Sequence, residues 1–371
     1  MRIVVAGGGS GGHIYPALAI LEALRQTDPH LTALYIGTGH GMEKDLVPRA
    51  GVPFQTIHAR GLLVKGWRGK LWGMSAAVRG VWDAWRLLKK FRPDVVVGTG
   101  GYVSGPVGVA AHWLKIPLVI QEQNAWPGLT NRILSRYAQA VLVPFAEAGQ
   151  NFPPGAHIIA AGNPITYATL PDRKTLRHQL NIDDKAVVLM VTGGSQGAAA
   201  INQFVLEFLP MVKNHPNWAL FWATGKRYYH EVMQVLADHA QWMDPNRIKV
   251  VEYFYDVQQY YAAADVFLGR AGAMTLADCF YFGLPSVLVP SPHVSENHQM
   301  HNARLVEKRG AALVVAEQDL AQIGMQKLSS LLCNAAERDK MASAARNLYD
   351  AQAMNRIVST IVSASKRRAR A

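Results

Sequence analysis

Two patterns of apolar positions alternate along the chain. Short runs that are apolar at nearly every position are followed by longer segments in which apolar residues recur every three or four positions. The first pattern is typical of buried strands and the second of amphipathic helices that cover them. The apolar runs lie at residues 2–7, 32–37, 94–100, 117–123 and 140–145, and then at residues 186–192, 218–224, 248–254, 264–269 and 285–292.

This alternation predicts an α/β protein in which parallel strands form doubly wound sheets. Because the pattern runs twice, we expect two Rossmann-like domains, connected through residues 151–165, where proline, glycine and asparagine cluster. The predicted bounds are 1–160 for the first domain and 161–340 for the second. Residues 341–371 are expected to form a C-terminal helix and a basic tail that packs back on the first domain.

Composition supports two folded cores. The chain has 371 residues, of which 50% are hydrophobic and 17% charged, so disorder is not expected. We expect no signal peptide, because Met1 to Ala6 has the pattern of a strand and glycines follow it. No apolar stretch reaches the ~18 residues that cross a bilayer. Cys279 and Cys333 are far apart in the sequence, which argues against a disulfide framework.

Glycine-rich turns follow several predicted strands. Residues 7–12 contain G-x-G-x-x-G between a strand and a helix, and residues 98–106 and 193–197 make similar turns. Such turns present backbone N–H groups to an oxyanion, so one in each predicted domain points to an enzyme that joins two phosphorylated substrates. A nicotinamide domain should also place an acid at the end of its second strand, but the first acid there is Glu43, past the turn. An NAD-dependent oxidoreductase is therefore disfavoured.

Polar side chains stand beside these turns. His13 follows the first turn, where it could cap its own helix or act as a general base for a hydroxyl group. Glu122 and Asn124 follow another predicted strand, at the edge where doubly wound sheets bind ligands. The three histidines of residues 292–303 suggest a metal site, but no H-x-x-x-H pair with a nearby carboxylate supports it. A hydrogen-bonding sugar site is favoured there.

Residues 60–92 concentrate positive charge in a chain whose net charge is +12, because they hold nine basic residues and one acid, Asp83. One interpretation is a helix that buries its apolar stripe in the core and exposes its basic face. Tryptophan beside lysine and arginine favours instead an anionic lipid surface, and the chain has no recognised nucleic-acid-binding module. The residues assigned to this membrane face are Leu71, Trp72, Val78, Trp82 and Trp85.

Several motifs resemble, in order and spacing, those of the MurG family, over nearly the whole chain. They are GGGSGGHIYPALAI, GTGHGMEKDLVPRAG, PDVVVGTGGYVSGPV, EQN followed by PGLTNR, GNP, GGSQGA, GRAGAMTLAD and ENHQMHNARLVEKRGAA. The resemblance implies the GT-B fold, with two domains facing a cleft, and a peripheral enzyme at the cytoplasmic face of the bacterial membrane. It implies inverting transfer, without metal or cofactor, of N-acetylglucosamine from UDP-N-acetylglucosamine to the C4 hydroxyl of the muramyl sugar on undecaprenyl diphosphate. This reaction converts lipid I to lipid II in peptidoglycan synthesis, so cell-wall synthesis proteins are expected partners.

The resemblance also implies roles for individual residues. His13 is the expected base for the C4 hydroxyl, and Glu122 is grouped with it as catalytic. Donor binding is implied for Asn124, Ser195, Gln196, Phe254, Arg270, Ala273, Met274, Asp278, His298 and Gln299. Acceptor binding is implied for Gly11, Gly12, Gly101, Tyr102 and Ser104. Within the donor set, Asp278 matches the acid that holds the ribose.

Three positions depart from the family pattern. Gln121 stands where the family has a histidine, Asp278 where it usually has a glutamate, and Thr166 where an arginine is common. Two alternatives stay open beside the transferase that the resemblance implies. One is a related GT-B transferase with another lipid acceptor, against which the intact His298–Gln299 pair argues, and the other is a basic binding protein without catalysis.

Overall fold

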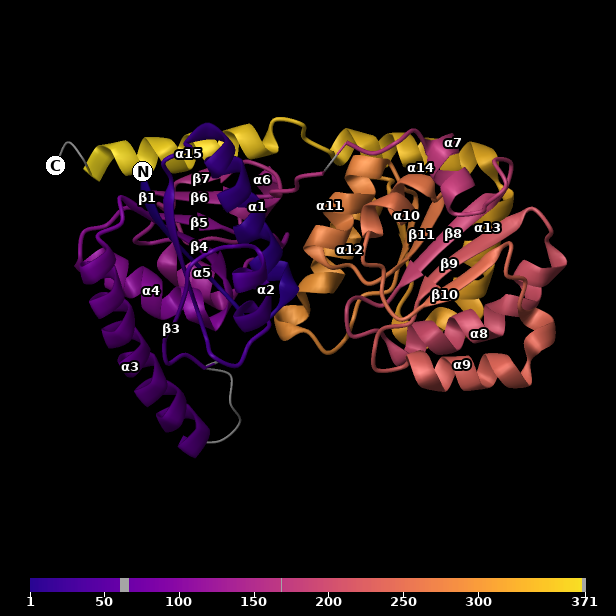
Figure 1. Cartoon of the computed structure of the whole chain (residues 1–371), viewed down its shortest axis with the longest axis horizontal. Coiled ribbons are helices and arrows are strands. Elements are labelled where there is room, and N and C mark those ends of the chain that lie inside the picture. Colours follow the sequence, from indigo (N-terminus) through magenta and orange to yellow (C-terminus); the bar gives the residue numbers. More distant parts are fainter. Residues whose placement is uncertain (61–66, 168, 369–371) are drawn as a thin grey trace. The chain divides into compact units, whose positions relative to one another are not determined.

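The structure, a computed structural model, describes residues 1–60, 67–167 and 169–368, with the backbone alone at 67–76 and 367–368. The described residues form two compact units (Figure 1). Unit 1 consists of Met1–Thr166 and the residues from Asp350 onward, and unit 2 consists of Tyr167–Tyr349. Each unit is built on a parallel sheet with helices on its faces, which confirms the predicted α/β class with two Rossmann-like domains.

The strands of unit 1 lie in the order β3-β2-β1-β4-β5-β6-β7. Central β1 pairs in parallel with β2 and β4, so that Val4 lies opposite Leu34 and Val96. Val4 and Val5 are both fully buried although they face opposite sides, because helices cover both faces of the sheet. The strands are β1 (Arg2–Gly7), β2 (Thr32–Gly37), β3 (Phe54–Thr56), β4 (Val95–Gly100), β5 (Leu118–Gln121), β6 (Ala140–Val143) and β7 (Ile158–Ala160).

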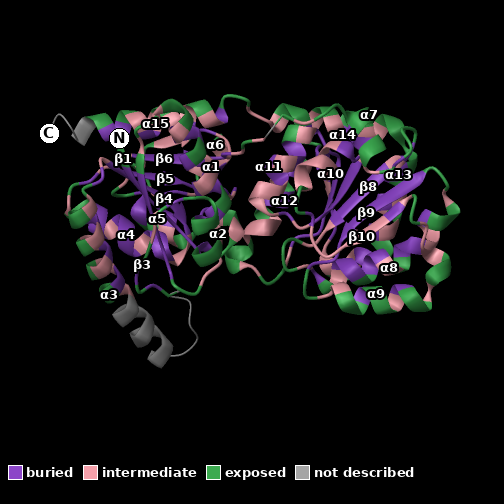
Figure 2. Cartoon of the chain, viewed as in Figure 1, coloured by how far each residue is buried: buried purple, intermediate pink, exposed green. Residues whose placement is uncertain are grey.

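Helices from both ends of the chain cover unit 1. Ile20 of α1 and Ile361 of α15 pack with Val5 on one face, whereas Leu88 of α3 and Val107 of α4 pack on the other. Figure 2 shows the resulting band of buried residues in the strands. The helices are α1 (Gly11–Thr27), α2 (Glu43–Arg49), α3 (Trp67–Phe91), α4 (Gly101–Trp113), α5 (Leu129–Leu134), α6 (Ala146–Gly149) and α15 (Ala353–Arg368).

Unit 2 repeats this plan with the strand order β10-β9-β8-β11-β12-β13. Phe204 of α8 and Leu328 of α13 pack with Val191 on one face, and Tyr261 of α10 packs on Phe267 of β11 on the other. The strands are β8 (Val187–Thr192), β9 (Trp218–Ala223), β10 (Ile248–Val251), β11 (Val266–Gly269), β12 (Ser286–Leu288) and β13 (Ala312–Val314). The helices are α7 (Arg173–Gln179), α8 (Ala199–Asn214), α9 (Tyr229–Asp238), α10 (Val257–Ala263), α11 (Ala273–Phe282), α12 (His298–Lys308), α13 (Met325–Cys333) and α14 (Ala335–Leu348).

The boundary near the C-terminus differs from the predicted one at residue 341. Helix α14 belongs to unit 2, where it packs against α11. The rings of Tyr281 and Tyr349 meet edge to face there, with their centroids 5.1 Å apart. The chain returns to unit 1 only at Asp350, and α15 then buries Ile357 and Ile361 in the core of that unit.

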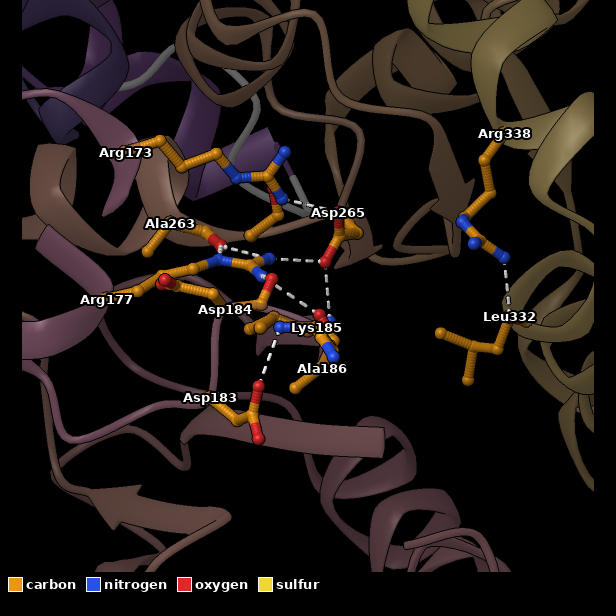
Figure 3. A network of polar contacts seen from close by, with 12 residues as sticks. Arg173, Arg177, Asp183, Asp184, Lys185, Ala186, Ala263, Asp265, Leu332 and Arg338 are labelled. Atoms are coloured by element: carbon orange, nitrogen blue, oxygen red, sulfur yellow. Dashed lines mark hydrogen bonds and ion pairs between the residues drawn. The ribbon is translucent and has the colours of Figure 1, made fainter. Parts of the chain in front are cut away.

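An ion pair with a buried arginine joins α7 to the sheet of unit 2 (Figure 3). The guanidinium of Arg177 lies 2.7 Å from a carboxylate oxygen of Asp265, the residue that precedes β11. The same guanidinium donates to the backbone carbonyls of Ala263, Asp184 and Ala186. Its charge is therefore compensated although the side chain is only 5% exposed.

Candidate functional site

In unit 1 the glycine turns after β1 and β4 lie in contact. A Cβ added to Gly101 would come within 2.3 Å of the carbonyl oxygen of Gly8, and one added to Gly9 would come within 2.9 Å of the Tyr102 ring. Gly100 and Gly101 adopt φ of +104° and +76°, which L side chains rarely adopt. The structure thus brings Gly101 and Tyr102, two of the predicted acceptor residues, against the first glycine turn.

Helix α1 begins directly after that turn. Its first residue is Gly11, and the preceding Ser10 makes no side-chain hydrogen bond to cap it. Gly12 and Ser10 are exposed. The first N–H groups of a helix have no partner within the helix and carry a partial positive charge, so Gly11 and Gly12 stand where an anion would bind.

Ser104, another predicted acceptor residue, has a different position. Its side chain is buried, and its hydroxyl lies 2.8 Å from the carbonyl oxygens of both Ala6 and Gly100. The hydroxyl also accepts from the backbone N–H of Gly100 at 3.0 Å. Ser104 therefore joins β1 to the turn after β4, and its hydroxyl is turned to the backbone instead of to a ligand.

Glu43 is a site residue that the sequence did not assign. It is fully buried under the first glycine turn, where it accepts from the backbone N–H of Thr38 at 3.1 Å, the Thr38 hydroxyl at 2.7 Å and the backbone N–H of Gly9 at 3.2 Å. A Cβ added to Gly8 would lie 2.6 Å from the same carboxylate. Glu43 thus fixes the shape of the glycine turn after β1, and the one sequence signal for it was an acid placed after the second strand.

The imidazole of His13 faces the ends of β4 and β5, not the end of its own helix. Its Nδ1 lies 3.1 Å from Oε1 of Gln123, a residue 110 positions away. A Cβ added to Gly100 would lie 2.9 Å from that Nδ1 and 3.5 Å from Nδ2 of Asn131. His13 therefore lies beside the turn after β4 and does not act as a helix cap.

Glu122 holds the loop that follows β5. Its buried carboxylate accepts from the backbone N–H of Asn124 at 2.9 Å, the Asn124 side chain at 3.1 Å, the backbone N–H of Gly128 at 3.1 Å and the Asn131 side chain at 2.8 Å. These donors occupy both carboxylate oxygens. The geometry makes Glu122 a positioning residue for Asn124, which differs from the catalytic role expected of it.

In unit 2 the turn between β8 and α8 exposes Ser195 and Gln196. Gly194 and Gly197 on either side have φ of +89° and +77°, and a Cβ on Gly197 would come within 2.1 Å of the carbonyl oxygen of Thr224. Helix α8 starts after this turn without a side-chain cap. The Ser195 hydroxyl and the backbone around it can therefore hold a phosphate at the start of a long helix.

Arg270, one of the predicted donor-binding residues, forms its contacts in the structure with other protein groups. Its guanidinium forms an ion pair with Glu317 at 2.5 Å and donates to the carbonyl oxygen of Val289 at 3.1 Å. The side chain is 14% exposed. Arg270 thus joins β11 to the segments after β12 and β13, so any contact with a diphosphate would have to use its other N–H groups.

Ala273 and Met274 begin α11, whose first turn has no side-chain cap. Asp278 follows on the same helix and accepts a short hydrogen bond from the hydroxyl of Tyr167. Burial raises the pKa of Asp278 to about 7, whereas the Tyr167 hydrogen bond acts in the opposite direction. Phe254 is buried against Tyr260, with ring centroids 4.3 Å apart.

His298 and Gln299 open α12 after a strained turn. Glu296 and Asn297 both have left-handed backbone, with φ of +53° and +51°, which costs energy in residues other than glycine. His298 Nδ1 donates to the carbonyl oxygen of Ser295 at 2.9 Å, and Gln299 accepts from a backbone N–H at 2.9 Å. Within the described residues, no three His, Cys, Asp or Glu side chains cluster in a way that could hold a metal ion.

The predicted membrane face is divided between surface and core. Val78 and Trp82 are 71% and 52% exposed, whereas Trp85 is half-buried, stacks on Trp82 and packs against the core. The side chains of Leu71 and Trp72 lie outside the described residues. The neighbouring helices α4 and α5 add exposed apolar side chains that the sequence did not single out, namely Trp113, Leu129 and Ile133.

Comparison with known proteins gives the family. Residues 3–143 match the glycosyltransferase family 28 N-terminal domain, and residues 188–358 match the C-terminal domain of that family. The chain belongs to glycosyltransferase family 28. Within family 28 it is a member of the MurG family, as the sequence motifs predicted.

Curated relatives in this family match the chain over almost its full length. A protein of Symbiobacterium thermophilum is 42% identical over 98% of this chain and 96% of its own length, and one of Moorella thermoacetica is 41% identical over 98% of both. Each is named UDP-N-acetylglucosamine–N-acetylmuramyl-(pentapeptide) pyrophosphoryl-undecaprenol N-acetylglucosamine transferase.

Solved structures agree with the family assignment. The crystal structure of Acinetobacter baumannii MurG superposes with a TM-score of 0.77 at 29% identity, and covers 98% of this chain and 99% of that one. A UDP-GlcNAc 2-epimerase from Neisseria meningitidis superposes with a TM-score of 0.67 at 17% identity, over 98% of this chain and all of that one. The second likeness shows the fold alone.

Proposed function

We propose that this family 28 enzyme transfers N-acetylglucosamine from UDP-N-acetylglucosamine to the C4 hydroxyl of the muramyl sugar of undecaprenyl-diphosphate-linked muramyl-pentapeptide, with inversion. The observation that carries this proposal is 42% identity over 98% of the chain to a protein named for that transferase activity. The product is lipid II of peptidoglycan synthesis.

Unit 1 supplies the acceptor side of the mechanism. The start of α1 at Gly11 and the turn at Gly101 bind the acceptor diphosphate through backbone N–H groups, with Tyr102 alongside. His13 takes the proton of the C4 hydroxyl as that oxygen attacks the anomeric carbon from the face opposite the leaving UDP. Glu43 and Glu122 keep the surrounding turns rigid, so the base and the anion site are organised before the substrate binds.

Unit 2 supplies the donor side. Negative charge grows on the UDP diphosphate as the glycosidic bond breaks, and Ser195, Gln196 and the start of α8 stabilise it. Asp278 holds the ribose, the backbone of Phe254 binds uracil, and the beginning of α11 faces the sugar. His298 and Gln299 hold the N-acetylglucosamine hydroxyls.

We also propose peripheral attachment at the cytoplasmic face of the membrane, with lipid I, anionic lipids and cell-wall synthesis proteins as partners. Support comes from exposed apolar side chains on α3, α4 and α5 among basic ones, such as Lys89, whose ammonium lies 4.7 Å from the Trp85 ring centroid. None of the described helices is long and apolar enough to cross a bilayer.

The test is transfer of labelled N-acetylglucosamine to a short-chain lipid I analogue, with EDTA present and with UDP-glucose and UDP-N-acetylgalactosamine in parallel. We expect donor-selective transfer that His13→Ala lowers by about 10²- to 10⁴-fold, because a positioned base contributes that much. His30→Ala, which removes an exposed histidine from the loop before β2, is the matched control. If UDP binds but no transfer occurs, the proposed acceptor is wrong. A full transfer rate in His13→Ala would show that His13 is not the base.

A further inference from the structure

A chain of three amide side chains leads inward from His13. The first member, Gln123, contacts His13 Nδ1 through its Oε1 at 3.1 Å. The second, Gln121, accepts a short hydrogen bond from Gln123 Nε2, and its own Nε2 lies 3.3 Å from Oδ1 of Asn163, the third member. Gln121 is fully buried and Gln123 is 2% exposed. We call these three residues the amide chain.

Backbone carbonyls determine which way each amide points. Nε2 of Gln123 lies 2.9 Å from the carbonyl oxygen of Thr99 and 3.0 Å from that of Gln121, and a carbonyl oxygen can only accept. Nδ2 of Asn163 donates to the carbonyl oxygen of Gln123 at 3.1 Å, and Nε2 of Gln121 donates to that of Glu122 at 3.2 Å. Reversing any one amide would turn an oxygen toward another acceptor, so all three orientations follow from the backbone.

The orientation of Gln123 in turn decides the protonation of His13. An amide oxygen can only accept, so the His13 nitrogen that faces Gln123 Oε1 must carry a proton. That nitrogen is Nδ1. In the neutral ring Nε2 then keeps its lone pair.

We propose that the amide chain selects the Nδ1–H tautomer of His13 and so makes Nε2 the atom that accepts the proton of the acceptor hydroxyl. Gln123 is the positioning residue that contacts the base, and Gln121 and Asn163 hold Gln123 in the required orientation. The catalytic part of this inference rests on the proposed function, whereas the tautomer follows from the contacts alone.

Gln121 stands where the family pattern has a histidine, and its place in the amide chain gives this difference a physical role. Gln121 presents an oxygen to Gln123 and an N–H to Asn163, and it has no proton to gain or lose across physiological pH. A neutral histidine at this position could also accept on one nitrogen and donate on the other. Gln121→His is therefore the conservative variant, and Gln121→Met is the variant that breaks the chain.

The test uses the full-length protein with its histidines labelled with ¹⁵N, and reads the His13 ring nitrogens by NMR with and without UDP. His13 signals are assigned by their absence in His13→Ala. We expect a protonated Nδ1 and an unprotonated Nε2 in the parent protein and in Gln121→His. Gln123→Met should give a mixture of His13 tautomers or the Nε2–H form. Gln121→Met should also increase the share of the Nε2–H form. Gln203→Met, at an exposed position on α8, is the matched control and should change nothing.

Transfer kinetics form the second readout. We expect Gln123→Met to lower kcat at least about tenfold while the KM for the donor stays the same, and Gln121→His to restore most of the rate that Gln121→Met loses. A protonated Nε2 in the parent, or an unchanged tautomer in Gln123→Met, would overturn the proposal. If the protein does not transfer to the lipid I analogue, the NMR result still decides the tautomer, so the two failures are distinguishable.

Discussion

At the scale of single residues, the buried acids Glu43 and Glu122 of unit 1 accept hydrogen bonds that hold nearby loops in place. Glu43 and Glu122 each accept several hydrogen bonds from nearby loops, and these donors engage both oxygens of each carboxylate. Asp278 in unit 2 differs, because its contact in the structure is the hydroxyl of Tyr167. Loss of its proton therefore affects the stability of unit 2.

Asp278 gives a prediction about pH. Its pKa is raised from 3.8 to about 7 in the folded protein, so the folded state binds this proton more tightly than the unfolded chain does. Its stabilising contribution is complete below about pH 4 and is lost as the pH rises to 7. We expect this group to lower the free energy of unfolding of unit 2 by at most about 1.4 kcal/mol per pH unit across that window.

Denaturant titrations at several pH values between 4 and 7.5 measure this effect, with Asp278→Asn compared with the parent protein. Asp278→Asn should remove that component of the slope, and the exposed Asp238→Asn on α9 should keep it. Equal slopes in the parent and in Asp278→Asn would show that the folded and unfolded states bind this proton equally.

The sequence predicted part of the site, and the part it missed depends on contacts between distant residues. The glycine turns and the start of α1 are local features, because a strand, a glycine run and a helix follow one another directly. The contact between His13 and Gln123 joins residues 110 positions apart, and that between Gly9 and Glu43 joins residues 34 apart. No spacing rule links such pairs, so only the fold identifies Gln123 and Glu43 as partners.

At the scale of elements, the central strands and the edge strand β10 were predicted, whereas the other three edge strands were not. β3, β7 and β13 lie at the edges of their sheets, and each spans three residues. An edge strand is short and partly exposed, so it lacks the continuous apolar run that identifies a buried strand. The predicted connection at 151–165 in fact contains β7.

The attachment of α7 depends on Arg177 more than on its neighbour Arg173. Both guanidinium groups contact Asp265, but the Arg177 side chain is 5% exposed and that of Arg173 is 49% exposed. We expect Arg177→Met to lower the free energy of unfolding by about 3–5 kcal/mol, because it removes a buried guanidinium with its hydrogen bonds and leaves a partly buried carboxylate without its main cation. Arg173→Met, the matched control, should cost about 1 kcal/mol or less. Equal losses in urea denaturation would contradict this account of the ion pair.

The exposed apolar side chains of α3 and α4 give a prediction about lipid binding. Sedimentation with vesicles that contain anionic lipid should capture the protein at low salt, and capture should fall as salt screens the basic residues. Trp82→Ala and Trp113→Ala should each weaken capture, because these side chains are 52% and 65% exposed, the first of them beside the guanidinium of Arg86. Tyr255→Ala, which removes a 71% exposed aromatic from unit 2, is the control. If neither tryptophan substitution changes capture, this surface is not the one that binds the vesicles.

At the scale of the whole molecule, the last helix belongs to the first unit. Because α15 completes the core of unit 1, that unit is assembled from both ends of the chain, and unit 2 is a continuous segment. Ile361 is fully buried in unit 1, so Ile361→Ala should lower the stability of that unit by about 2–5 kcal/mol through the cavity it leaves. The turn at Ser195, which we propose binds the donor, lies in unit 2, so saturating UDP should raise the stability of that unit, by about 2.7 kcal/mol at a hundred times its Kd.

Calorimetry can separate these two effects. We expect two unfolding transitions. Ile361→Ala lowers the midpoint temperature of one and UDP raises that of the other, so that UDP added to Ile361→Ala moves the two midpoints apart. Val362→Ala, at a half-buried position on the same helix, should lower the first transition by less, because a partly exposed side chain leaves a smaller cavity. If UDP instead raised the transition that Ile361→Ala lowers, the donor would bind unit 1 or the units would unfold together. Either result would contradict the assignment of donor binding to an independently stable second unit.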